Sequence, residues 1–277
     1  MISSCNILKE FPQSGQKQVV LADHPDFGKI IIKTGDIDNL ISLERIKREV
    51  DLLSEIDSIF YPKQYLFNID LKSKRFEIVE EYIEGKTLRE CADNFKTKKD
   101  IFELLLKLVD GLNLIWSEGI VHRDLKPENL IIRPNNMPCI IDLGIARFLQ
   151  SNSLTISIAP YGPCTPIYAS PEQLTNKKQL IDHRTDFFAL GIICLELYLG
   201  IHPFVNHKND ELISIVDNIM QNLYVTSTDL VPEDLAITEF ANNTLQFQPY
   251  NRFRNQYVIS KFLKEQIWYE NLPPNWI

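Results

Sequence analysis

The chain has 277 residues, of which 44% are hydrophobic, and its formal net charge is -8 at pH 7. This length and composition allow one large hydrophobic core or two modest ones. The acidic balance argues against general nucleic-acid binding, because phosphate backbones are bound by basic surfaces.

The sequence carries no sign of export or membrane insertion. Its start lacks the charged-then-apolar pattern of a secretory signal. The longest apolar stretch, residues 187–199, is shorter than the roughly 20 residues that a spanning helix needs. Five cysteines form no C-x-x-C pair and leave one odd, which is typical of a reducing compartment. We therefore expect a cytoplasmic protein with neither a membrane nor a nucleic acid as partner.

The first hundred residues predict two β-hairpins with a helix between them. The first hairpin follows the opening segment 9–21, turns at residues 23–28 and returns along residues 29–33, and the second joins residues 65–70 to 75–79. Residues 39–56 predict an amphipathic helix, because apolar residues recur at spacings of three and four. These apolar positions are Leu43, Ile46, Val50 and Leu53.

The remainder of the chain predicts helices. Residues 100–117 have an apolar face along one side, and Asp100 is able to cap the start of this helix. Residues 187–199 are apolar almost throughout and predict a buried helix. From Gly200 onward the pattern favours short helices.

The segment from His122 to Asn129, with the sequence HRDLKPEN, places a carboxylate, an ammonium and a carboxamide within six positions. A second carboxylate, Asp142, follows a short apolar run. Transfer of a γ-phosphoryl group needs a carboxylate to accept the hydroxyl proton, a cation near the transferred group and oxygen ligands for Mg²⁺. Asp124, Lys126 and the pair Asn129 and Asp142 supply these groups in turn.

This segment resembles the catalytic loop of protein kinases, H-R-D-x-K-x-x-N, and Asp142-Leu143-Gly144 resembles their metal-binding D-F-G. Residues 164–172 resemble the family's G-T-P-x-Y-M-S-P-E segment. The resemblance implies an α+β, two-lobed protein-kinase-like fold, with a small antiparallel β-sheet lobe that carries one helix and a larger, mainly helical lobe. It implies one kinase domain over 1–277, with the first lobe and the hinge at about 1–83 and the second lobe at 84–277.

The resemblance also assigns roles to individual residues. Asp124 and Lys126 are catalytic, whereas Asn129 and Asp142 bind Mg²⁺. Lys33 neutralises the ATP phosphates and is held by Glu49, with Glu44 as the second candidate, while the hinge backbone at Glu81 and Ile83 bonds adenine. The full expected ATP-binding set is Lys33, Glu49, Ser14, Gly15, Gln16, Glu81, Ile83 and Ile131.

Thr165 together with Lys126 points to protein substrates with serine or threonine acceptors. Arg123 beside the catalytic aspartate implies control by phosphate on the segment 142–172, and therefore autophosphorylation or a regulatory partner. The candidate acceptors there are Ser151, Ser153, Thr155 and Ser157. Glu128 favours basic residues before the acceptor. The sequence identifies neither the physiological substrate nor the oligomeric state.

Two departures from the family pattern support an alternative function. The nucleotide loop is poor in glycine and retains Gly15 alone, and Glu80 falls at the gatekeeper position, where an apolar or hydroxyl residue is common. A pseudokinase that acts as a binding or scaffold module would show such changes. A small-molecule phosphotransferase of related fold is disfavoured by Lys126 and by the Ser170-Pro171-Glu172 segment.

Four further residues are expected to belong to the scaffold and to take no part in the chemistry. Glu172 is expected to pair with Arg252, and Asp186 to anchor the loop backbone. His122 lies among apolar residues, which indicates a core histidine.

Overall fold

The computed structural model describes residues 5–12, 18–37, 47, 50–51, 54–143, 165–205, 211–224 and 234–271. The chain forms two compact units, one made of residues 1–85 and 139–158 and the other of residues 86–138 and 159–277. Each unit buries its own set of apolar side chains. Within the described residues, no helix combines the length and the apolar character that crossing a bilayer requires.

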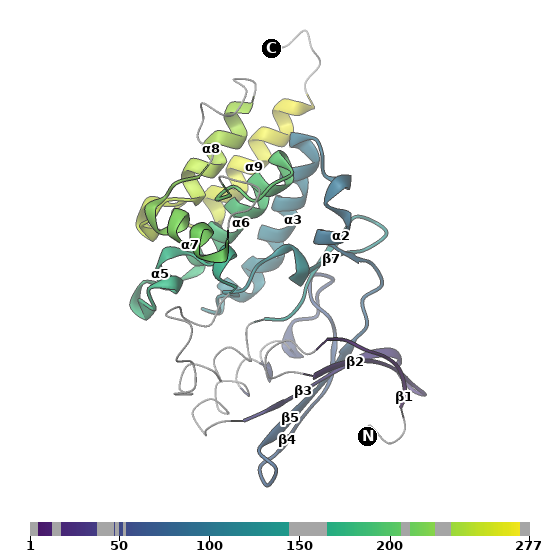
Figure 1. The fold of residues 1–277 in the computed structure, drawn as a ribbon. Helices are drawn as coiled ribbons and strands as arrows, with labels where there is room; N and C mark the ends of the chain where they lie inside the picture. The colour runs from purple at the N-terminus through teal and green to yellow at the C-terminus, as the bar shows by residue number, and fades with distance from the viewer. Residues whose placement is uncertain are drawn as a thin grey trace. The chain divides into compact units, whose positions relative to one another are not determined.

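The first unit contains a five-stranded antiparallel sheet with the strand order β1-β2-β3-β5-β4 (Figure 1). The strands are β1 (Asn6–Glu10), β2 (Gln18–His24), β3 (Gly28–Asp36), β4 (Gln64–Asp70) and β5 (Arg75–Glu81). Both predicted hairpins are confirmed, as β2–β3 and β4–β5. The sequence did not predict β1, because all five of its residues are exposed and its sequence therefore lacks apolar alternation.

The register of the sheet decides which side chains share a face. Lys33 of β3 lies opposite Ile78 of β5, and Ile31 lies opposite Glu80. Because alternate residues of a strand point to the same side, Lys33 and Glu80 lie on one face of neighbouring strands. The opposite face carries the buried apolar cluster of Val20, Ala22, Ile30, Ile32 and Val79.

The helix predicted over residues 39–56 falls mostly outside the described residues. Helical residues are described at Lys47, Val50, Asp51 and 54–55, with Val50 buried and Lys47 exposed, as the amphipathic pattern predicts. Glu49 and the residues Ser14, Gly15 and Gln16 lie outside the described residues.

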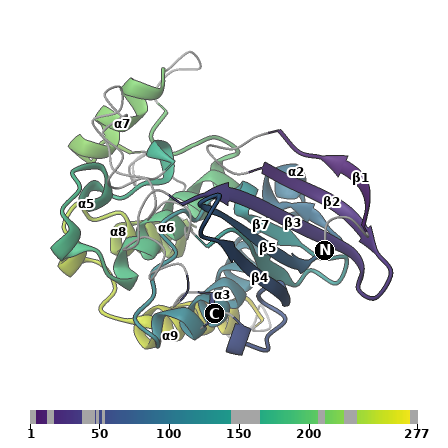
Figure 2. The ribbon, with the colours of Figure 1, turned by 90° about the horizontal axis from the view of Figure 1, so that it is seen from below.

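The second unit is mainly helical. In it, α3 (Lys98–Trp116) packs against α9 (Gln256–Glu270) and α6 (His183–Leu199), and α6 packs against α8 (Leu235–Thr244) (Figure 2). Asp100 caps the start of α3 as predicted, but from within the first turn and not as the N-cap, because the helix begins two residues earlier. Thr97 is the N-cap, and Asp100 completes a capping box with it.

The shorter elements connect this framework. They are β6 (Lys86–Thr87), α2 (Leu88–Cys91), β7 (Leu130–Ile132), α5 (Pro171–Leu174), α7 (Leu212–Gln221) and the 3-10 helices Ala92–Asn94, Pro127–Asn129, Pro166–Tyr168, Lys178–Leu180 and Pro249–Asn251. Strand β8 (Pro138–Ile140) spans the boundary between the units along the chain.

Helix α6 is the buried helix that the sequence predicted. At its centre, Gly191 lies against α8, and an added Cβ would stand 2.3 Å from Thr244 Oγ1. The helix ends at Gly200, whose φ of 71° is the left-handed conformation that glycine adopts readily. This packing fixes the position of Asp186, in the first turn of α6, next to the backbone of His122 and Arg123.

Candidate active site

In the second unit, the loop that carries the HRDLKPEN sequence is held by one buried carboxylate. Asp186 is 1% exposed and accepts hydrogen bonds from Trp116 Nε1 at 2.8 Å, from the His122 backbone N–H at 2.9 Å and from the Arg123 N–H at 2.9 Å. Burial raises the pKa of Asp186, and the nearby His122 and these hydrogen bonds offset that effect only in part. The expected backbone anchor is therefore confirmed.

Three predicted site residues of this unit meet at the Asp124 side chain. Lys126 Nζ lies 3.5 Å from Asp124 Oδ2. Asn129 Nδ2 donates to the Asp124 carbonyl oxygen at 2.8 Å and to Asp124 Oδ2 at 3.3 Å. Asp124 and Asn129 are each 6% exposed, so the loop presents them in fixed positions.

Thr165 joins this group from 41 residues further along the chain. Its backbone N–H and its hydroxyl both donate to Asp124 Oδ1, at 3.3 and 2.8 Å, and its hydroxyl accepts from Lys126 Nζ at 3.0 Å. The sequence analysis used Thr165 only as a mark of acceptor type. Its contact with the loop was missed, although the match of residues 164–172 to the family segment was the available signal.

His122 is the core histidine that the sequence indicated. It is fully buried, and its Nδ1 accepts a hydrogen bond from the Asp124 N–H at 3.3 Å. Glu172 and Arg252 form the expected ion pair through two contacts of 2.7 and 2.9 Å, with both side chains fully or almost fully buried. Both predictions are confirmed.

Glu128 is engaged by a residue that the sequence analysis did not consider. Arg89 of α2 donates through Nε to Glu128 Oε1 at 2.8 Å and through Nη1 to Glu196 Oε1 at 2.7 Å, and it also contacts the Tyr168 hydroxyl. Tyr168 in turn donates to Glu196 Oε2 at 2.5 Å. The carboxylate that was expected to select basic substrates is therefore already paired with an arginine of the same chain.

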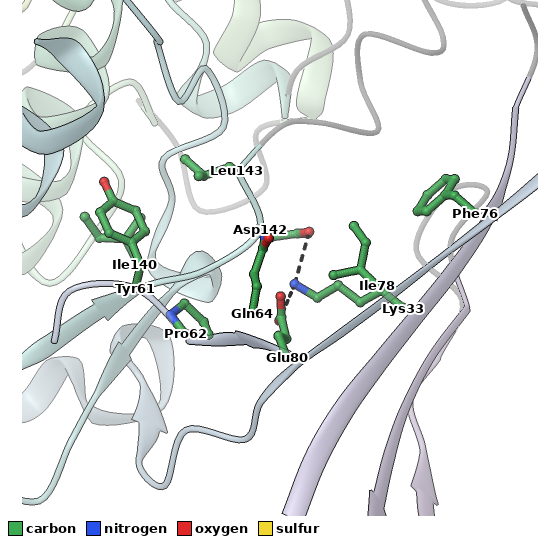
Figure 3. Close-up of a pocket in the computed structure, with 10 residues that line it drawn as sticks. All are labelled: Lys33, Tyr61, Pro62, Gln64, Phe76, Ile78, Glu80, Ile140, Asp142 and Leu143. Carbon is green, nitrogen blue, oxygen red and sulfur yellow. Dashed lines mark ion pairs between the residues drawn. The ribbon is translucent and has the colours of Figure 1, made fainter. Parts of the chain in front are cut away.

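In the first unit, Lys33 projects into a cavity of about 40 Å³ (Figure 3). Lys33 Nζ lies 2.6 Å from Glu80 Oε1 and 3.8 Å from Asp142 Oδ1. Burial alone lowers the pKa of Lys33, but Glu80 and then Asp142 raise it, and the net pKa lies above its ordinary value. Lys33 therefore remains charged at neutral pH although it is buried.

Asp142 reaches this cavity because the strand before it is tied to the same unit. The Ile140 N–H donates to the Phe60 carbonyl oxygen at 2.7 Å. Ile140, which precedes Asp142 in the chain, and Leu143, which follows it, also line the cavity. Asp142 has a φ of 60°, a conformation that Asp tolerates better than most residues. The structure thus brings Lys33 and Asp142 together in the first unit.

Of the two described carboxylates that contact Lys33, the nearer is Glu80, which was not in the expected set. Glu49 lies outside the described residues, so its expected pairing with Lys33 stays a prediction. The signal for Glu80 was available in part, because two hairpins in the correct register place it diagonally across from Lys33.

The expected hinge and adenine-contacting residues divide between the two units. The Glu81 N–H is used within the first unit, where it donates to the Lys63 carbonyl oxygen at 2.8 Å. Ile83 follows and is 3% exposed. Ile131 lies in the second unit, on β7, opposite Thr87 of β6.

A carboxylate, an ammonium and a carboxamide in one loop, together with a buried lysine on a sheet, are the groups that a phosphotransferase uses. The model of the protein kinase domain family matches residues 22–264. The chain belongs to this family, and the predicted two-lobed α+β fold class is confirmed.

Curated relatives are named as serine/threonine kinases. The chain is 37% identical over 132 residues to serine/threonine-protein kinase PknB of Mycolicibacterium smegmatis. That alignment covers 46% of this chain and 20% of the relative. The chain is 26% identical over 237 residues to a probable serine/threonine-protein kinase PknB of Lactococcus lactis, and this alignment covers 82% of this chain and 36% of the relative. The chain thus spans between 20% and 36% of the length of these two relatives.

Proposed function

We propose that this chain is a serine/threonine protein kinase that transfers the γ-phosphoryl group of ATP to protein hydroxyls, its own included. The observation that carries the proposal is the cluster of Asp124, Lys126 and Asn129, with Thr165 bonded to the first two. The family match over residues 22–264 and the names of the relatives support the same activity.

In the reaction, the substrate hydroxyl oxygen forms a bond to the γ-phosphorus while the bond between the γ-phosphorus and the ADP oxygen breaks. Asp124 accepts the proton of that hydroxyl. Asn129 and Thr165 donate hydrogen bonds to the Asp124 carboxylate, which fixes its orientation. Lys126 Nζ, 3.5 Å from that carboxylate, is placed to screen the negative charge of the transferred group.

Asn129 and Asp142 fit the expected role as Mg²⁺ ligands by their chemistry. Both supply oxygen, the ligand that Mg²⁺ prefers, and the Asn129 amide nitrogen is committed to Asp124, so its oxygen is the atom left for a metal. Across the described residues, no group of three or more His, Cys, Asp or Glu side chains could hold a metal ion. A bound Mg²⁺ ion would neutralise charge on the ATP phosphates.

Lys33 binds the ATP phosphates in this proposal, and its raised pKa supports a permanent positive charge there. Since the Glu81 N–H is bonded to the Lys63 carbonyl, the Glu81 carbonyl is the group proposed to accept from adenine, with the Ile83 backbone and the Ile131 side chain beside the base. Ser14, Gly15, Gln16 and Glu49 complete the proposed set on the resemblance alone.

The test is Asp124→Asn, assayed with Mg-ATP for autophosphorylation and for transfer to a generic protein acceptor. Loss of the general base should lower transfer by about a thousandfold, while ATP affinity stays close to that of the wild type. Asp110→Asn, at an exposed position of α3, is the matched control and should retain activity. A wild type that labels neither itself nor the acceptor, and behaves as Asp124→Asn does, would overturn the proposal.

A thermal-shift titration with ATP separates the kinase from a pseudokinase, the binding or scaffold module that the glycine-poor loop suggests. A pseudokinase without nucleotide would show no rise in melting temperature with ATP, with or without Mg²⁺. The named relatives give that alternative no support. The proposal further includes a protein substrate, a regulatory partner and a cytoplasmic location, the last supported by the sequence pattern of five cysteines without a C-x-x-C pair.

A further inference from the structure

Lys33 and Glu80 form a buried ion pair on neighbouring strands of the sheet. Lys33 Nζ and Glu80 Oε1 are 2.6 Å apart, and each side chain is 10% exposed. The pair lies on the face opposite the apolar cluster of the sheet, at the edge of the cavity that also contains Asp142 (Figure 3). Both residues therefore stand on rigid, hydrogen-bonded backbone, and the geometry of the pair follows from the register of β3 and β5.

The contact leaves Lys33 able to bind a ligand. An ammonium group has three N–H donors, and Glu80 Oε1 takes one of them. Asp142 Oδ1, at 3.8 Å, is beyond hydrogen-bond distance, so its attraction is electrostatic only. Lys33 Nζ is thus held between the two carboxylates with donors left for phosphate oxygens.

Stability alone does not account for this pair. Removing two charges from water costs about as much as their attraction returns, so a buried ion pair adds little net stability. What such a pair does supply is a fixed orientation. A lysine has four rotatable side-chain bonds, and a carboxylate at 2.6 Å restricts its Nζ to one side of the cavity.

We propose that Glu80 is a positioning residue for nucleotide binding, which holds Lys33 Nζ toward the Asp142 side of the cavity from a fixed place on the sheet. The inference rests on the proposed role of Lys33 in binding ATP. Glu80 acts through Lys33 and does not itself contact the phosphates. The carboxylate at the gatekeeper position, which the family pattern does not explain, then has a function in this chain.

The test is a double-mutant cycle measured as affinity for a non-hydrolysable ATP analogue with Mg²⁺, by calorimetry on the purified protein. The variants are Glu80→Gln, Lys33→Met and the two together. Glu77→Gln is the matched control, since Glu77 lies on the same strand but on the opposite face. This readout needs no phosphoryl transfer, so it remains usable when Lys33→Met abolishes activity.

We expect Glu80→Gln to weaken analogue binding and to raise KM for ATP by about tenfold, as the loss of an oriented charge contact would. On the Lys33→Met background the same substitution should have no further effect, because Glu80 acts only through the lysine. Glu80→Asp, which keeps the charge on a shorter side chain, should give an intermediate KM. It also replaces Glu80→Gln in the cycle if that variant does not fold.

An unchanged affinity for the analogue in Glu80→Gln would overturn the inference. An equal loss of affinity on the wild-type and Lys33→Met backgrounds would also overturn it, since that outcome means a structural role. The inference is overturned as well if Glu49→Gln raises KM for ATP and Glu80→Gln does not. In each of these cases wild-type transfer activity persists, so the proposed function survives. A wild type that binds no nucleotide overturns both together.

Discussion

The Thr165 hydroxyl donates a hydrogen bond to Asp124 Oδ1 at 2.8 Å and accepts one from Lys126 Nζ at 3.0 Å. One hydroxyl thus ties together the two residues proposed to carry the chemistry. It belongs to the segment that follows residues 144–164, so the orientation of the Asp124 carboxylate depends on a distant part of the chain.

Removal of this hydroxyl should lower kcat. We expect Thr165→Ala to reduce kcat by about tenfold, because a hydrogen bond to a charged group contributes about 1.5–3 kcal/mol. Thr165→Ser keeps the hydroxyl and should retain most of the activity. Steady-state kinetics with saturating ATP measures both variants, and wild-type kcat in Thr165→Ala would show that the contact has no part in catalysis.

The buried pair of Glu172 and Arg252 should be costly to break. Glu172→Gln leaves the arginine buried without its counter-charge, and we expect it to lower the free energy of unfolding by about 3–5 kcal/mol. Urea unfolding followed by circular dichroism measures this loss. Glu265→Gln breaks the exposed pair with Lys261 on α9 and should change stability little. Equal effects of the two substitutions would contradict the prediction.

Arg89 should suppress selection of basic substrates. It neutralises Glu128, which is part of the catalytic loop segment, and Glu196 of α6. In Arg89→Ala both carboxylates become available, and we expect kcat/KM for a peptide with an arginine near the acceptor to rise by up to about fivefold over a neutral peptide, the range of a partly exposed charge pair. The two peptides are compared on wild type and variant, and an unchanged ratio would argue against this role.

His202 should make stability depend on pH. Burial lowers the pKa of this imidazole, with Glu196 and the Ile167 carbonyl offsetting the effect only in part. Its Nε2 lies 2.9 Å from the Ile167 carbonyl oxygen, which can only accept, and its Nδ1 accepts from the Phe204 N–H at 3.4 Å, so the folded state holds the neutral ring.

The direction of this pH dependence follows from the protons that His202 binds in the folded and unfolded chain. As pH falls below about 6.5, the unfolded chain binds a proton at His202 that the folded chain does not, so the free energy of unfolding decreases. His202→Gln should lose this component, and the difference between wild type and variant should shrink on acidification from pH 7 to pH 5. Denaturant unfolding at several pH values measures it, and a difference that does not change with pH would rule the effect out.

Much of the proposed site was predictable because its chemistry is written in one short segment. Asp124, Lys126 and Asn129 lie within six positions, so these three residues are necessarily close to one another in the folded chain. The hairpins were predictable from alternation for a similar local reason. Strand β1 was not, since an exposed strand carries no such pattern.

The sequence by itself determined the type of protein, the loop that carries its polar groups, and the pairing of Glu172 with Arg252, which the family pattern specifies. Only the tertiary structure decided which side chains surround those groups. Thr165 reaches Asp124 across 41 residues, and Arg89 reaches Glu196 across 107. Glu80 meets Lys33 because β3 and β5 pair in one particular register. A shift of one residue in this register would turn Glu80 to the opposite face of the sheet. Because no turn joins β3 directly to β5, their register is decided by the tertiary structure.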